Sequence, residues 1–167
     1  MSPETESNVL EFSKTRKENM VDKSQYLTFK VGQENYGIKL VKNKEVIKPR
    51  QITNVPHTEE YVMGVINLRG QIVPVINLGD KLELSREQDN INEENSRIIV
   101  VQVDETLIGI KVDRVEDVVA INDEEIESIN ENKREISQEY IKGVFSFKET
   151  LVIILDINKI LFGINAM

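Results

Sequence analysis

Apolar and polar residues alternate along the chain from Tyr26 onward. In the stretch YLTFKVGQENYGIKL, the apolar side chains of Leu27, Phe29 and Val31 alternate with polar ones, and Gly-Gln-Glu-Asn interrupts the pattern. A period of two places apolar side chains on one face of a strand, so the stretch predicts a β-hairpin. The preceding residues 1–24 are mostly polar and charged, and they predict a flexible N-terminal tail.

The same apolar pattern occurs twice in the chain. An offset of 72 residues sets YLTFKVGQENYGIKLVKNKEVI against IIVVQVDETLIGIKVDRVEDVV and brings Gly37 onto Gly109. A second offset, of 79 residues, sets EYVMGVINLRGQIVPVINLGDKL against EYIKGVFSFKETLVIILDINKIL. Two blocks that recur in the same order indicate a duplicated unit of about 70 residues.

Each unit holds about five short strands rich in valine and isoleucine, which suits a small closed barrel. We therefore predict an all-β fold of two similar barrels related by an approximate two-fold axis, with short helical turns in INDEEIESI and INKILFG. An exchange of strands between the barrels stays open. The predicted divisions are a tail at 1–24, a first barrel at 25–84, a connecting loop at 85–96, a second barrel at 97–162 and a C-terminal tail at 163–167.

The copies differ at a turn in which the first has Arg69 and Gly70 and the second has lysine and glutamate. Glycine supplies a positive φ or admits a close backbone there, so Arg69 projects from a stiff tip. Three interpretations stay open. Arg69 pairs with Glu45, taken as the end of the strand that begins at Tyr36; it binds a carboxylate of a partner protein; or it is a solvated turn residue.

Pro74 is a second difference, because the other copy has Ile153 at this position. Proline has no N–H to donate to a neighbouring strand, which predicts an edge strand or a bulge. An edge strand here protects the sheet from wrong pairing or leaves the rim of the first barrel open for docking.

Composition narrows the class of partner. The formal net charge is −8, from 29 acidic and 21 basic residues, which argues against nucleic acid and anionic membranes as partners. Cysteine is absent, so disulfides and thiolate metal sites are excluded. No stretch has the length of a membrane span or the pattern of a signal peptide, and we expect a cytoplasmic protein.

Residues that could carry out catalysis do not gather in the sequence. His57, the only histidine, lies in the polar connection NVPHTEEY, and the carboxylates near Asp113 and Asp123 alternate with other charges as on a solvated face. No nucleophile elbow and no phosphate-binding loop is present. We therefore expect a binding module and no enzyme, with no cofactor and no metal.

The stretch GVINLRGQIVPVINL, preceded by YGIKLVKNKEVI and followed by RIIVVQVDETLIGIKVDRVEDVV, closely resembles CheW, the coupling-protein family of bacterial chemotaxis. The resemblance runs from Tyr26 to Leu161. It implies two five-stranded SH3-like barrels and a non-enzymatic adaptor. The implied partners are the regulatory domain of a CheA-like histidine kinase and the cytoplasmic tip of methyl-accepting chemoreceptors, with membrane association only through the receptors.

The resemblance also implies which residues contact these partners. Asn67, Leu68, Arg69 and Gly70 match the family signature, and Glu45 matches an acidic residue near that arginine; barrel surfaces near the turn are expected to meet the kinase. The receptor tip is expected in a groove between the barrels, lined by Ile38, Val46, Val112 and Val115. Two positions depart from the family pattern, since it has an apolar residue at Asn43 and an acidic one at Lys39.

Other functions stay open at this stage. The chain could form rings or filaments by head-to-tail contacts, or serve as a CheW-like scaffold for a different signalling kinase. A CheV-like adaptor would need an additional receiver domain of about a hundred residues. A small β-barrel hydrolase or lyase would need an enclosed pocket around His57 or around paired carboxylates.

Overall fold

The computed structural model describes residues 23–41, 44–84, 92–129 and 136–164. The strands are β1 (Lys23–Val31), β2 (Glu34–Lys39), β3 (Glu45–Ile47), β4 (Val62–Leu68), β5 (Gln71–Asn77), β6 (Arg97–Val103), β7 (Thr106–Val112), β8 (Arg114–Asn122), β9 (Ile141–Phe147) and β10 (Thr150–Leu155). The short helices are α2 (Leu78–Lys81), α3 (Ile157–Leu161) and the 3-10 turns η1 (Asp123–Glu125) and η2 (Gln138–Tyr140). Lys23 and Ser24, predicted to end the flexible tail, instead begin β1, and the rest of that tail lies outside the described residues.

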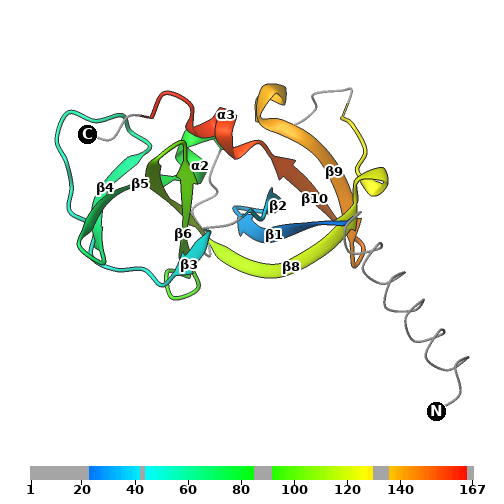
Figure 1. The fold of residues 1–167 in the computed structure, drawn as a ribbon, viewed down its shortest axis with the longest axis horizontal. Coiled ribbons are helices and arrows are strands. Elements are labelled where there is room, and N and C mark those ends of the chain that lie inside the picture. The colour runs from blue at the N-terminus through cyan, green and yellow to red at the C-terminus, as the bar shows by residue number, and fades with distance from the viewer. Residues whose placement is uncertain (1–22, 42–43, 85–91, 130–135, 165–167) are drawn as a thin grey trace, which may run out of the picture.

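The strands form two five-stranded sheets, and each sheet takes strands from both copies of the repeat. Sheet A has the order β8-β1-β2-β10-β9, and sheet B has the order β3-β6-β7-β5-β4. In Figure 1, the blue strands β1 and β2 accordingly lie among the yellow and orange strands from the end of the chain. The all-β fold is confirmed, and the strands are exchanged between the halves 25–84 and 97–162, an arrangement that the sequence left open. Each barrel joins the first two strands of one copy to the last three of the other.

Parallel pairs join the exchanged strands at equivalent places in the two barrels. β5 pairs with β7 with Val75 opposite Gly109, and β10 pairs with β2 with Ile154 opposite Gly37. A Cβ atom on Gly109 would lie 2.9 Å from Cγ2 of Ile98. Glycine recurs at this position because strands and side chains pack too closely there for a larger residue.

A further backbone bridge closes each sheet into a barrel. β3 pairs with β6 at one edge of sheet B, and Thr53, further along the same segment, bridges to Val65 of β4 at the opposite edge through two hydrogen bonds of 2.9 Å. Glu127, after β8, bridges to Val144 of β9 in the same way. Gly64 lies at the first bridge, where a Cβ atom would stand 2.1 Å from the carbonyl oxygen of Thr53.

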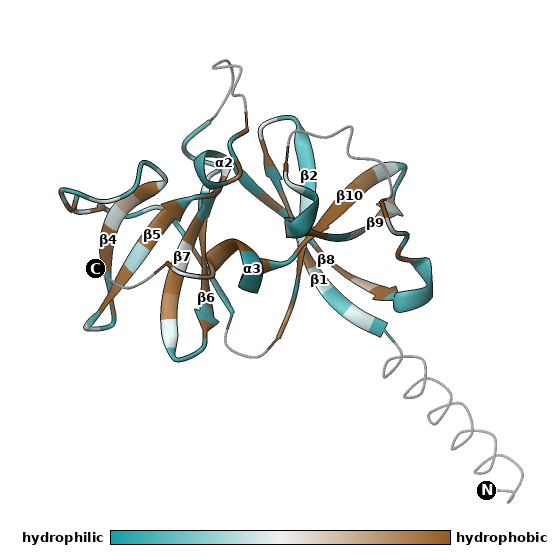
Figure 2. Ribbon diagram, turned by 90° about the horizontal axis from the view of Figure 1, so that it is seen from above, coloured by the Kyte–Doolittle hydropathy of each residue, from teal (hydrophilic) through white to brown (hydrophobic). Residues whose placement is uncertain are grey.

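Three clusters of buried apolar side chains hold the molecule together. The largest takes residues from both sheets and from α2 and α3, and Figure 2 shows apolar stretches on the strands on both sides of α3. A second cluster fills barrel B, with Ile47, Ile66, Leu68, Val73, Val75, Ile98 and Val100. A third fills barrel A, with Tyr26, Val119, Ile121, Phe145, Val152 and Ile154. The largest cluster joins the two sheets, so the barrels share a core in addition to the cluster inside each.

Pro74 does not lie on an edge strand, because β5 is placed between β7 and β4. Its partner on β4, Val65, turns its own N–H and C=O away to Thr53, so no hydrogen bond toward β4 is lost. The parallel pairing with β7 begins only at Val75. The missing N–H therefore falls where the β5–β7 pairing ends, and the prediction of an open rim at this strand is wrong.

Short helical turns follow the last strand of each copy. The Asn77 side-chain oxygen accepts a hydrogen bond of 3.1 Å from the Asp80 N–H at α2, and Asp156 accepts one of 3.2 Å from Lys159 at α3. The sequence predicted α3 but not α2. The turn η1 lies within the predicted INDEEIESI, and the side chain of Asn122 before it makes no capping hydrogen bond.

Candidate functional site

The β4–β5 turn holds its two central residues in the left-handed region. Arg69 has φ 50° and Gly70 has φ 85°, as a type I′ turn requires. The side-chain oxygen of Asn67 accepts a hydrogen bond of 2.9 Å from the N–H of Gly70. The equivalent turn adopts the same conformation with Lys148 at φ 50° and Glu149 at φ 63°. Glycine is therefore the favoured residue at this position, although the fold does not require it.

Arg69 forms a two-pronged ion pair with Glu45. The Nη1–Oε1 distance is 2.9 Å and the Nη2–Oε2 distance is 2.7 Å. The hydrogen bonds from Arg69 hold the pKa of Glu45 below its usual value. Of the three interpretations of Arg69, pairing within the chain is confirmed. Glu45 does not end the strand from Tyr36, however, because that strand ends at Lys39 and Glu45 begins β3 in the other sheet.

A second guanidinium lies beside this pair. Arg50 donates a hydrogen bond of 3.1 Å to the carbonyl oxygen of Asn67, and its charge also lowers the pKa of Glu45. Sequence reasoning missed Arg50, since the connection that carries it shows no periodic pattern. We call the group formed by Glu45, Arg50, Asn67, Arg69 and Gly70 the turn site.

Exposed apolar side chains flank the turn site and its equivalent on the other barrel. Val46, next to Glu45, is 41% exposed and Ile72 is 66% exposed; their counterparts under the repeat offsets, Val118 and Leu151, are 58% and 40% exposed. Ile72 was missed from the sequence. Its alternation with the buried Val73 is the signal that could have found it.

The four residues expected to line a groove between the barrels lie in different surroundings. Ile38 and Val112 are each 1% exposed and belong to the core between the sheets, so as surface residues they were predicted wrongly. Val115 packs partly against that core, and only Val46 is exposed. β2 and β7 are buried on both faces because one face lines a barrel and the other meets the opposite sheet. Asn43 lies outside the described residues.

Groups suited to catalysis do not converge in the described part of the chain. His57 is exposed in a turn with φ 63°. Among the described residues, no three His, Asp or Glu side chains are placed to hold a metal ion. No helix within these residues is long and apolar enough to cross a membrane.

Comparisons with known proteins agree with this geometry. A family model described as CheW-like domain matches residues 25–163. The chain is 35% identical over 137 residues to the chemotaxis protein CheW of Klebsiella aerogenes, covering 82% of this chain and 81% of that protein. It is 33% identical to the chemotaxis protein CheW of Treponema pallidum, covering 81% of each.

A solved structure has the same fold. The scaffolding protein TtCheW from Thermoanaerobacter tengcongensis superposes with a TM-score of 0.74 at 29% identity, covering 83% of this chain and 88% of that one. The two-barrel architecture of this chain is therefore that of a known scaffolding protein.

Proposed function

Since the chain belongs to the family of CheW-like domains, we propose that it is a chemotaxis adaptor that binds the regulatory domain of a CheA-like histidine kinase and the cytoplasmic tip of methyl-accepting chemoreceptors. It acts by contact alone and uses no cofactor or metal. It works in the cytoplasm and reaches the membrane only through the receptors. The names of its relatives describe chemotaxis proteins and a scaffolding protein, which supports this proposal.

The turn site is the surface that we assign to the kinase. The observation that carries this assignment is the exposed, two-pronged pair of Arg69 and Glu45 between the exposed apolar side chains of Val46 and Ile72. Exposed ion pairs contribute little to the stability of the fold. This pair instead fixes the orientation of two charged side chains at the edge of the apolar surface that the kinase would cover. Val46 and Ile72 then supply the area that binding removes from water.

The receptor tip is assigned to the connection from β2 to β3, where the chain passes from one barrel to the other. Val41 is 59% exposed there, and Leu40 packs partly against the shared core. Asn43 belongs to this connection, and its role stays a prediction. Val115 lies at the start of β8 and pairs with Phe29 of β1, away from the end of β2, so its contact with the receptor stays a prediction from the resemblance. Each contact is expected to bury roughly 1,200 Å² or less, as transient signalling contacts do.

A calorimetric titration with the kinase regulatory domain tests the proposal. Ile72→Glu is expected to weaken binding at least about tenfold, because a carboxylate then has to be buried in the contact. Leu151→Glu is the matched control, since it makes the same chemical change at the equivalent position of the other barrel. Equal affinity of Ile72→Glu and the parent chain would contradict the assignment. If neither the parent chain nor any variant binds the kinase domain, the chain would be a scaffold for a different kinase.

A ring subunit is a second candidate, supported by the charges around the two equivalent apolar pairs. The residues within four positions of Val46 or Ile72 along the chain include three cations and one carboxylate: Lys48, Arg50, Arg69 and Glu45. The equivalent positions around Val118 and Leu151 hold one cation and two carboxylates: Lys148, Asp117 and Glu149. Faces of opposite charge favour head-to-tail contacts, which close into rings when the rotation permits.

Sedimentation velocity at increasing protein concentration tests the ring. Self-association that Val118→Glu and Ile72→Glu each abolish would support it, because a head-to-tail contact needs both faces. A monomer at all concentrations, alone and with the kinase domain, would contradict it.

A further inference from the structure

Three lysines gather where β2 ends. Lys39 is the last residue of β2, Lys44 lies just before β3, and Lys142 is near the start of β9. The Nζ of Lys44 donates a hydrogen bond to the carbonyl oxygen of Lys39. Burial, and then the charge of Lys142, lower the pKa of Lys44 to about 8. We call these three residues the lysine cluster.

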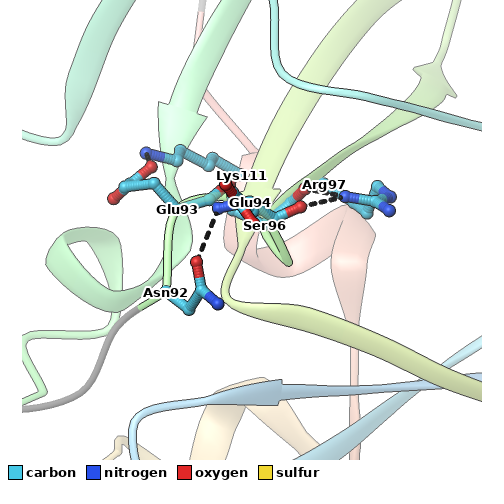
Figure 3. A network of polar contacts seen from close by, with 6 residues as sticks. All are labelled: Asn92, Glu93, Glu94, Ser96, Arg97 and Lys111. Carbon is cyan, nitrogen blue, oxygen red and sulfur yellow. Dashed lines mark hydrogen bonds and ion pairs between the residues drawn. The ribbon is translucent and has the colours of Figure 1, made fainter.

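The equivalent place on the other barrel carries no such excess of positive charge (Figure 3). Lys111, the counterpart of Lys39, forms an ion pair of 2.7 Å with Glu93. Glu116 stands in place of Lys44 and lies 3.8 Å from Arg114, and Met63 stands in place of Lys142. In the described ranges, by contrast, the lysine cluster forms no ion pair with any carboxylate.

The segment that carries Glu93 is itself held in place, as Figure 3 shows. The N–H of Glu94 donates to the Asn92 side chain at 3.0 Å, the Ser96 hydroxyl donates to the Glu93 carbonyl at 2.8 Å, and Arg97 donates to the carbonyls of Glu94 and Ser96 at 2.9 and 2.7 Å. The neutralising carboxylate is thus part of the second copy's fold. The two copies share a fold but differ in whether a carboxylate neutralises this lysine. The difference therefore indicates that the lysine cluster serves binding and is not needed for folding.

Like charges that are partly buried without a counterion disfavour the folded state, and an anion bound among them relieves that cost. The surroundings of the lysine cluster indicate what kind of anion fits. Val41, two residues after Lys39, is 59% exposed, and Leu40 is only partly buried. A ligand that offers carboxylates beside apolar side chains matches both features, whereas free phosphate matches only the charge. The net charge of −8 disfavours binding of nucleic acid, which is itself strongly negative.

We propose that the lysine cluster binds acidic side chains of the chemoreceptor segment that docks beside Leu40 and Val41, and so selects receptors with carboxylates at that position. This inference rests on the proposed function and specifies the chemistry of its receptor contact. Lys39 and Lys142 are exposed and reach the incoming carboxylates, while the half-buried Lys44 holds the charge between them.

The test is a titration of the full chain with the purified cytoplasmic signalling fragment of a receptor from the same cell. The variant Lys39→Gln/Lys142→Gln is expected to bind about tenfold more weakly than the parent chain. Raising the salt concentration from about 50 to about 500 mM is expected to weaken the parent strongly and the variant little. Lys30→Gln/Lys148→Gln is the matched control and is expected to keep the parent's affinity. It removes the same charge from two lysines far from the cluster, one near the end of β1 and one just after β9.

The kinase regulatory domain distinguishes failure of this inference from failure of the proposed function. If the parent and the cluster variant bind the receptor fragment equally, or if the control loses as much affinity, the inference is wrong although the adaptor function stands. Inorganic phosphate at about 10 mM is a second check. If it weakens receptor binding as much as loss of both lysines does, the cluster is a general anion site and the inference is wrong. A parent that binds neither fragment nor kinase domain contradicts the proposed function itself.

Discussion

Arg69 and Glu45 form the contact whose geometry is best defined in the turn site, with both terminal nitrogens of Arg69 and both carboxylate oxygens of Glu45 engaged. Both side chains are exposed, so water screens the attraction and the pair adds little to the stability of the fold. Its effect is to fix direction, because a guanidinium donates two parallel hydrogen bonds to a carboxylate that lies in its plane. The ion pair therefore makes the turn site rigid, and the neighbouring Val46 and Ile72 provide the apolar surface that a partner would bury.

A double-mutant cycle measures this role. Arg69→Ala, Glu45→Gln and the combined variant are each expected to unfold within about 2 °C of the parent, because exposed pairs contribute little. Each single change is expected to weaken kinase binding about tenfold, and the combined variant no further, since either change abolishes the pair. Additive losses of affinity would mean that the two residues contact the kinase independently. Thermal unfolding and calorimetric titration give the two readouts.

The same pair predicts how binding depends on pH. Arg69 holds the pKa of Glu45 below its ordinary 4.5, so the carboxylate stays charged in the folded protein until the pH falls through that lowered value. Kinase binding is therefore expected to be insensitive to Glu45 between pH 8 and 5, which titrations of the parent and Glu45→Gln at several pH values would test. A parent that loses its advantage over the variant above pH 5 would contradict this.

Lys44 predicts a change of stability at alkaline pH. Its pKa is about 8 in the folded protein against 10.5 in a free side chain, so the folded state releases its proton first. The contribution of Lys44 to the free energy of unfolding is therefore most unfavourable below pH 8. It becomes less unfavourable, and stability rises, as the pH increases from 8 to 10.5. Lys44→Gln is expected to gain about 1 kcal/mol at pH 7, discounted for screening of a half-exposed group, and to lack that rise. Urea unfolding at pH 7, 9 and 10.5 measures both; a variant that is less stable at pH 7 would contradict it.

At the scale of the elements, the two closing bridges and the two hairpin turns constrain the barrels in different ways. Gly70 and Gly64 both have positive φ, at 85° and 140°, but a Cβ on Gly70 would meet nothing within 4 Å. A Cβ on Gly64 would instead enter the space occupied by the backbone of Thr53. The turn therefore depends on backbone conformation alone, whereas closure of barrel B also depends on the absence of a side chain.

Alanine substitutions separate these two constraints. Gly70→Ala is expected to cost about 1 kcal/mol, the strain of a left-handed residue. Gly64→Ala is expected to cost about 3 kcal/mol or more, because the Thr53–Val65 bridge has to move apart. Chemical denaturation of the two variants gives the comparison, and equal losses of stability would show that closure at Thr53 tolerates a side chain.

Much of this element-level organisation was predictable from the sequence, and the reasons for the exceptions are physical. The alternation around Phe29 and the two offsets predicted the hairpins and the duplication, and the contrast at Arg69 left its pair with Glu45 as one of three interpretations. The exchange of strands could not be deduced, because a strand equivalent to β2 presents the same pattern to either copy. Ile38 and Val112 were misplaced for a related reason, since alternation cannot distinguish a strand buried on both faces from one with an exposed face.

At the scale of the whole molecule, the exchange makes the two barrels one unit. β1 and β2 complete barrel A together with three strands from the second copy, and the largest core lies between the sheets. The shared core holds the two barrels at a fixed separation, and with them the surfaces that we propose for the kinase and the receptor.

Cutting the chain between the copies tests this unity. A protease site introduced within residues 85–91 is expected to yield two fragments that stay associated and keep the parent's circular dichroism spectrum. Each fragment alone is expected to be unfolded, because it lacks the strands that complete either barrel. A fragment that folds by itself would contradict the account of a shared core.

The central claim, that this chain couples a receptor to a kinase, is tested most directly by a bridging experiment. The kinase regulatory domain is immobilised, and capture of the receptor signalling fragment is measured with and without the chain, with Ile72→Glu and Leu151→Glu in parallel. The account predicts that the parent and Leu151→Glu capture the receptor fragment and that Ile72→Glu does not. A chain that binds the kinase domain but adds nothing to receptor capture would contradict it.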